Sequence, residues 1–223
     1  MSVITISREL GSQGSVIAEK AAQALGYRLV DKNTVETVFH EYGMSSLKDE
    51  YDSIPHFWDR FDARKMDQRR NVLSMLNETL LALAHHDDVV ILGRGGFAIL
   101  HGYRDVLHVR IQAPLDVRVQ RVQEQSEIAG PDQAGDLIKS NDRLQKEFIR
   151  TVYGADWLNA ADFDLVIDTG KIDPDHAAEL IVASARALPA KDLAGPTTTE
   201  LRIDKFLAEA VDEALNPAGV PAG

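Results

Sequence analysis

Residues 3–30 read VITISRELGSQGSVIAEKAAQALGYRLV, and this stretch decides the fold. The β-branched run at 3–7 predicts a buried strand, which ends at the glycine-rich residues 11–15. Apolar residues then recur at helical spacing up to Gly26, a residue type suited to a helix C-cap, and 27–30 predicts a second strand. The order strand, glycine-rich turn, helix, strand is typical of a parallel α/β fold.

The same alternation continues along the chain. It predicts further strands at 89–92, 106–111 and 165–168, and further helices at 67–86, from Pro114 onward, at 141–152 and at 175–188. Alternating apolar strands and amphipathic helices predict a parallel sheet of about five strands with helices on both faces. Ligands of such sheets bind at the carboxyl ends of the strands.

Composition excludes several classes of protein. The chain has 223 residues, of which 44% are hydrophobic, and it contains no cysteine. Disulfide scaffolds, thiolate zinc sites and cysteine nucleophiles are therefore excluded. No apolar run approaches the ~20 residues of a membrane span, and the first residues do not resemble a secretory signal, so we expect a cytoplasmic protein without a membrane partner. A formal net charge of −11 argues against a nucleic-acid partner.

Four segments differ from the main α/β pattern. Residues 32–65 mix aromatic and charged residues without a long period, and 123–140 is polar with several glycines and a proline, which predicts a mobile loop. Residues 189–199 are expected to form a linker between a main domain at 1–188 and a final amphipathic helix and tail at 200–223. The apolar stripe of that helix is expected either to dock on the chain's own helices or to form a homodimer contact.

The turn after the first strand has the composition of a phosphate-binding loop. Its backbone N–H groups and the following helix N-terminus suit a phosphate, and two serines add hydroxyl donors. The standard motif has a lysine before its Ser or Thr, and Gly14 stands in that position if Ser15 is the hydroxyl residue. The turn alone is compatible with a phosphate cradle or with a plain tight turn. Its residues are Gly11, Ser12, Gln13, Gly14, Ser15 and Val16.

Arginines gather near the same predicted edge of the sheet. Arg94 stands between glycines at the end of the strand at 89–92. The glycines are expected to leave space for a ligand beside its planar guanidinium, which suits a phosphate. Others lie on the two following helices, at Arg118, Arg121, Arg143 and Arg150. The alternative for each is a solvated position on a turn or helix face. Nearby acids that could accept a proton or hold a metal are Glu9, Asp31, Asp142 and Asp168.

Three stretches together resemble the cytidylate kinase-like proteins, a branch of the nucleoside monophosphate kinases among the P-loop kinases. ITISRELGSQGSVIAEKAAQALGYRLVDKNTVE is similar to the opening of the family, and VVILGRGGFAIL is similar to its G-R-G strand end. DRLQKEFIRTVYGADWLNAADFDLVIDTGKI is similar to its closing block. The resemblance covers about residues 1–185.

The resemblance implies an ATP-dependent phosphotransferase that uses Mg²⁺ and a small-molecule nucleotide substrate. Residues 8–16 would surround the ATP phosphates, with Ser15 near the metal. Arg94 would hold the acceptor phosphate. Residues 32–65 would bind the acceptor, and 123–140 would form a lid. The remaining implied roles are substrate binding by Asp31, Asp142 and Arg143, to which we add Arg150, and charge neutralisation at the start of the lid by Arg118 and Arg121.

Departures from the family pattern leave two hypotheses. The loop lysine is absent, Gln13 and Ser15 replace a glycine and an arginine, and Gly95 replaces the aspartate of a G-R-D strand end. Since phosphoryl transfer needs a cation near the phosphates, we assign that role to Arg8, the nearest cation in the sequence. The first hypothesis is a kinase acting on a CMP-like or another small acceptor. The alternative is a nucleotide-binding or sensing protein with impaired catalysis.

Overall fold

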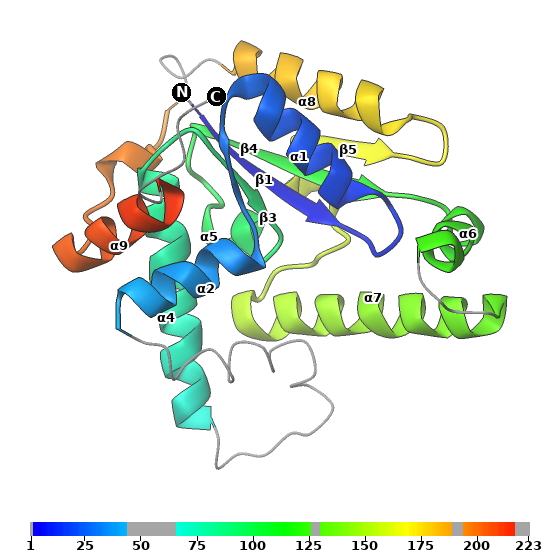
Figure 1. The fold of residues 1–223 in the computed structure, drawn as a ribbon, viewed down its shortest axis with the longest axis horizontal. Coiled ribbons are helices and arrows are strands. Elements are labelled where there is room, and N and C mark those ends of the chain that lie inside the picture. The colour runs from blue at the N-terminus through cyan, green and yellow to red at the C-terminus, as the bar shows by residue number, and fades with distance from the viewer. Residues whose placement is uncertain (1, 44–65, 126–129, 189–193, 217–223) are drawn as a thin grey trace.

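The computed structural model describes residues 2–43, 66–125, 130–188 and 194–216. Its sheet consists of β1 (Val3–Arg8), β2 (Arg28–Val30), β3 (Val89–Leu92), β4 (Val106–Gln112) and β5 (Leu165–Asp168). All neighbouring strands are parallel, in the order β2-β3-β1-β4-β5, so β1 lies at the centre (Figure 1). The predicted parallel α/β sheet of about five strands is confirmed.

Helices cover both faces of this sheet (Figure 1). One face packs against α1 (Gly14–Leu25) and α8 (Pro174–Ala187), and the other against α2 (Lys32–Glu41), α4 (Met66–His85), α5 (Gly96–Ile99) and α9 (Lys205–Leu215). Beyond the carboxyl ends of the strands lie α6 (Leu115–Gln125) and α7 (Pro131–Tyr153). Two 3₁₀ turns, η4 (Ala160–Asp162) and η5 (Thr198–Glu200), complete the secondary structure that is described. Within the described ranges no helix combines the length and the apolarity that a membrane span requires.

The irregular segment expected at 32–65 begins with a regular helix, α2, so that prediction is wrong for its first part. Asp31 is the N-cap: its Oδ1 accepts from the backbone N–H of Thr34 at 3.0 Å, and the Thr34 hydroxyl completes a capping box. Buried side chains at 35, 38 and 39 then fix the helix against the core. Residues 44–65, the rest of the expected acceptor-binding region, lie outside the described residues.

The loop predicted at 123–140 is helical at both ends, because α6 continues to Gln125 and α7 already begins at Pro131. Gly130 and Pro131 mark a helix start here, since proline is well tolerated in the first helical turn. Ala134 and Ile138 of α7 pack against Val122 of α6. The described helix therefore starts ten residues before the expected position 141, and residues 126–129 lie outside the described residues.

The segment expected to be a linker, 189–199, is anchored at its end. Thr198 is fully buried, and its backbone N–H and hydroxyl both donate to the carboxylate of Asp105, the hydroxyl at 2.7 Å from Oδ2. The final helix, α9, begins at Lys205 after the N-cap Asp204, later than the expected start at 200. Its buried residues, among them Leu207 and Val211, pack against α2 and α4, whereas Phe206 of the same stripe is 70% exposed. Docking on the chain's own helices therefore covers part of the stripe, and the homodimer contact stays a prediction. Residues 189–193 and the expected tail at 217–223 lie outside the described residues.

Thr198→Val removes the hydroxyl that donates to Asp105 and keeps the volume of the side chain. We expect the free energy of unfolding to fall by about 1.5–3 kcal/mol, the usual range for a hydrogen bond to a charged group. Urea denaturation measures this change. The control, Thr199→Val, alters an exposed neighbour and should change the value by less than about 0.5 kcal/mol. Equal effects of the two substitutions would contradict the anchoring role of Thr198.

Candidate functional site

The loop between β1 and α1 presents a helix N-terminus at the carboxyl edge of the sheet. Gly11 (φ 81°) and Gln13 (φ 63°) have left-handed backbones, and the side chain of Gln13 makes no capping hydrogen bond to α1. Ser15 and Val16 are exposed in the first turn of α1. Ser12 is buried, and its hydroxyl donates to the carbonyl of Glu9 at 2.8 Å. The first turn of α1 can therefore receive an anion, whereas the hydroxyl of Ser12 holds the loop in shape.

The side chain of Arg8 occupies the space over Gly14. A Cβ on Gly14 would overlap the Cβ of Arg8 and lie 2.9 Å from its Cγ. The guanidinium extends to Gly93 at the end of β3, where a Cβ would overlap Nη1 of Arg8. Arg8 therefore crosses from β1 to the end of the neighbouring strand, and no side chain at position 14 can share its place.

The glycines of the turn at 93–96 have a different role from the one we expected. Gly93, Arg94 and Gly95 all have left-handed backbones, at φ 76°, 56° and 76°. We expected the glycines to leave space for a ligand beside Arg94. Their missing side chains instead make room for protein groups: Arg8 lies against Gly93, and a Cβ on Gly95 would overlap the ring of Tyr153. A non-glycine residue in this conformation is strained, which is common at functional sites.

Tyr153 fills the space beside Gly95, the residue that stands where the family's G-R-D pattern has an aspartate. It is the last residue of α7, and its hydroxyl donates to Oδ1 of Asn77 on α4 at 3.0 Å. Burial raises the pKa of the Tyr153 phenol well above its usual value, so the hydroxyl stays protonated and remains a donor. An aspartate at position 95 would collide with this ring, so glycine at 95 and tyrosine at 153 fit together.

The two arginines of α6 are held by groups of the chain itself. Arg118 is buried and donates through Nη1 to both carboxylate oxygens of Asp142, at 3.1 and 2.9 Å. Arg121 donates to the hydroxyl and the carbonyl of Thr169, at 3.0 and 2.7 Å, and to the carbonyl of Gly11 at 3.4 Å. Arg121 thereby ties α6 to the phosphate-loop turn and to the end of β5.

The other predicted site residues are only partly brought together. Asp142 joins the cluster through Arg118, whereas Arg143 and Arg150 are exposed on α7. Asp31 lies at the end of β2 and caps α2, as described above. Among the described residues there is no group of three or more histidines or acids that could hold a metal ion. A metal at this edge would therefore need ligands from a bound phosphate in addition to Ser15.

Two residues central to this edge, Arg110 and Trp157, were not assigned a role from the sequence, and Glu9, expected only as a proton acceptor or metal ligand, pairs with arginines instead. The carboxylate of Glu9, 12% exposed, pairs with Arg110 at 3.0 Å and with Arg118 at 3.4 Å. Arg110 is buried with its guanidinium 4.5 Å from the ring centre of Trp157. Burial lowers the pKa of Arg110, and the adjacent charge of Glu9 opposes that shift. Arg110 could have been recognised from the sequence, because a charged residue inside an apolar strand is unusual.

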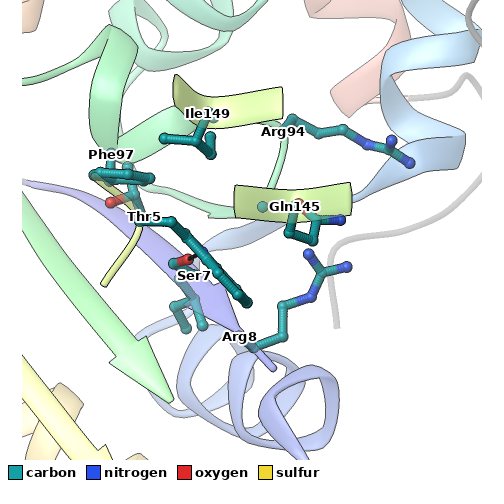
Figure 2. A pocket seen from close by; sticks show the side chains of 11 residues that line it. Thr5, Ser7, Arg8, Arg94, Phe97, Gln145 and Ile149 are labelled. Atoms are coloured by element: carbon teal, nitrogen blue, oxygen red, sulfur yellow. Dashed lines mark hydrogen bonds between the residues drawn. The ribbon is translucent and has the colours of Figure 1, made fainter. Parts of the chain in front are cut away.

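A pocket opens between the carboxyl ends of β1 and β3, the turn at 93–95 and α7 (Figure 2). Figure 2 shows Arg8 extending from β1 toward Gln145 of α7, while Arg94 extends away from Phe97. Trp157 forms another wall, and its indole N–H donates to the hydroxyl of Ser7 at 2.7 Å. The space inside, about 10 Å³, would hold about one water molecule. A larger ligand therefore requires side chains at this edge to move.

Comparison with known proteins agrees with this architecture. The chain is 30% identical over 182 residues to the cytidylate kinase of Ignicoccus hospitalis, covering 81% of this chain and 97% of the relative. It is 25% identical over 187 residues to the cytidylate kinase of Methanobrevibacter smithii, covering 83% and 99%. An uncharacterized protein from Eubacterium ventriosum shares the fold, with a TM-score of 0.63 at 21% identity over 84% of this chain and 99% of that structure. Residues 3–171 match the model of the cytidylate kinase-like family, and the chain belongs to that family.

Proposed function

We propose that the protein transfers the γ-phosphoryl group of ATP, with Mg²⁺, to a nucleoside monophosphate such as CMP. The observation that carries the proposal is the place of Arg8. Its side chain covers Gly14, the position of the missing lysine, and its guanidinium reaches the end of β3. The chain thus supplies a cation from β1 where the usual motif supplies one from the loop. The cytidylate kinases among its relatives support the same reaction class.

The residues of the phosphate loop fit a bound ATP and its metal ion. Backbone N–H groups in the first turn of α1 would hold the phosphates of the donor, and the exposed hydroxyl of Ser15 would be a ligand of Mg²⁺. When bound, the metal ion would neutralise part of the phosphate charge. Arg8 and the α1 N-terminus would then orient the phosphoryl group, which is the main task of a protein in this chemistry.

We assign the acceptor to the pocket beside Arg94 and Gln145. Arg94 would bind the acceptor phosphate, and region 32–65 would contact the rest of the molecule. Because the pocket is nearly filled, binding requires an opening motion. We assign that motion to the proposed lid at 123–140, which includes the end of α6 and the start of α7. Arg118 and Arg121 could neutralise the transferred group only by leaving their present partners.

Arg8→Ala should lower kcat by roughly a hundredfold, which corresponds to about 2.7 kcal/mol of lost transition-state stabilisation. The measurement is steady-state formation of ADP from Mg²⁺–ATP with CMP, dCMP, UMP and AMP as acceptors. Near-parental turnover in Arg8→Ala would make Arg8 structural. Nucleotide binding by the parent without turnover on any acceptor would favour the sensing alternative.

A lysine at position 14 should restore activity only where residue 8 has no Cβ. Arg8→Ala is insufficient, because a Cβ on residue 14 would overlap the Cβ of residue 8. We therefore expect the double variant Arg8→Gly/Gly14→Lys to exceed Arg8→Gly in kcat by at least about tenfold, or 1.4 kcal/mol. Gly14→Lys alone should be impaired. Equal activity of the single and double variants would contradict the exchange of the two cations.

Gly14→Ala and Gly135→Ala should change stability in opposite directions. Both residues lie in helices, where alanine is favoured over glycine by about 0.5–1 kcal/mol. A Cβ at 135 would meet only Val119 Cγ2 at 3.8 Å, an ordinary contact, whereas at 14 it would overlap Arg8. We expect Gly135→Ala to raise the free energy of unfolding by that amount and Gly14→Ala to lower it by about 1–3 kcal/mol, as measured by urea denaturation. A gain for both would refute the close contact.

Arg94→Lys keeps the charge but loses the planar fork of the guanidinium. We expect kcat/KM for the acceptor to fall at least about tenfold, or 1.4 kcal/mol, with little change in Tm because lysine meets the same left-handed backbone. The control Arg186→Lys lies on α8, away from this edge, and should leave the kinetics unchanged. Parental kinetics in Arg94→Lys would remove the residue from the acceptor site.

A further inference from the structure

Glu9 lies where the loop, the sheet and α6 meet. Its carboxylate Oε1 accepts from Arg110 Nη2 at 3.0 Å, and its Oε2 accepts from the backbone N–H of Ala113 at 3.3 Å. Arg118 Nε lies 3.4 Å from the same Oε2. One nearly buried acid thus faces two buried arginines, whose charges repel each other. Arg110 depends most on the position of this carboxylate, because an uncompensated buried charge is costly, whereas Arg118 also pairs with Asp142.

The backbone of Glu9 also begins the phosphate loop. Its carbonyl accepts from both the backbone N–H of Ser12 at 3.2 Å and the hydroxyl of Ser12 at 2.8 Å. Its N–H donates to the carbonyl of Ile111 on β4 at 3.1 Å. These hydrogen bonds connect the shape of the loop directly to the backbone that carries the Glu9 carboxylate.

Arg110 connects Glu9 to a wall of the acceptor pocket. Its guanidinium stacks on the ring of Trp157 and donates to the carbonyl of the same residue. Trp157 in turn donates to Ser7, and both residues line the pocket. This aromatic wall is therefore connected to Glu9 through Arg110.

Arg118 connects Glu9 to a second wall of the pocket, formed by α7. Its two hydrogen bonds to Asp142 hold α7, and Asp142 precedes Gln145 by three residues, which places the two on neighbouring positions of the helix surface. Gln145 and Ile149 of α7 line the pocket. Two walls of the acceptor pocket are thus tied through separate arginines to the residue that starts the donor loop.

We propose that Glu9 is a positioning residue that couples the ATP site to the acceptor site, so that binding of one nucleotide strengthens binding of the other. The inference rests on the proposed function, because it requires both nucleotides to bind. Coupling of this kind is reciprocal, and factors of about 5–150 are typical. It gives Glu9 a role that differs from a contact with either substrate.

The test compares acceptor affinity with and without donor. Calorimetry with the full chain measures binding of CMP, or of the monophosphate that the turnover assay selects, in the absence and presence of Mg²⁺ and β,γ-imido-ATP. In the parent we expect the donor analogue to tighten acceptor binding at least about fivefold. In Glu9→Gln that ratio should fall below about twofold. Glu19→Gln removes the same charge from an exposed position on α1 and should keep the parental ratio.

A spectroscopic readout follows Trp157 directly. The chain has two tryptophans, so Trp58→Phe makes Trp157 the only one. In that background the donor analogue should shift the emission of Trp157, and Glu9→Gln should abolish the shift. If Glu9→Gln does not fold, Asp142→Asn cuts only the connection to α7 and should lower the affinity ratio by about half or more.

The outcomes separate the two proposals. A parental ratio in Glu9→Gln, or in Asp142→Asn where that variant stands in for it, overturns the coupling role and leaves the proposed function standing. A parent that binds both nucleotides with a ratio near one has the same consequence. A parent that binds no nucleotide overturns both proposals.

Discussion

The pleat of β1 places Arg8, its last residue, and Glu9, which follows it, on opposite sides of the sheet, and the candidate site depends on this alternation. Ile4 and Ile6 face α1, so Arg8 lies on the same side and runs over Gly14. Ser7 faces Trp157, and Glu9 continues on that side to meet Arg110. A shift of one residue in the register between β1 and β4 would exchange the sides of Arg8 and Glu9. Arg8 would then no longer lie over Gly14, and Glu9 would no longer meet Arg110.

This edge of the sheet carries two kinds of positive charge. Arg110 and Arg118 are buried and paired with acids, so they hold the architecture of the edge. Arg8 and Arg94 line the pocket and lie at the ends of β1 and β3. Removing one partner of a buried ion pair is costly, which favours a fixed structural role for Arg110 and Arg118. Arg8 and Arg94 are the residues to which the proposed function assigns the phosphates.

Much of the fold could be predicted from the sequence because short apolar strands and amphipathic helices have distinct periods. The start of α7 could not, because Gly130, Pro131 and Gly135 together have the composition of a loop. Pro131 has a local reason, since proline fits a first helical turn, whereas Gly135 has a tertiary one, since it faces Val119 of α6. The α2 helix was missed for a related reason, since its N-cap Asp31 pairs with a threonine instead of the Glu or Gln of the usual capping box.

The residues of the candidate site could be predicted from the sequence only where a single local stretch contains them. The glycine-rich turn and Arg94 stand out in the chain, but the partners of Glu9 are about a hundred residues away on β4 and α6. Their meeting depends on strand register, which a single sequence does not specify. The glycines at 93 and 95 show the same limit: both permit a left-handed turn, yet the side chains that fill the space come from β1 and α7. In an acidic chain with a net charge of −11, the arginines at this edge are gathered by topology and not by composition, which supports the phosphate site that we propose there.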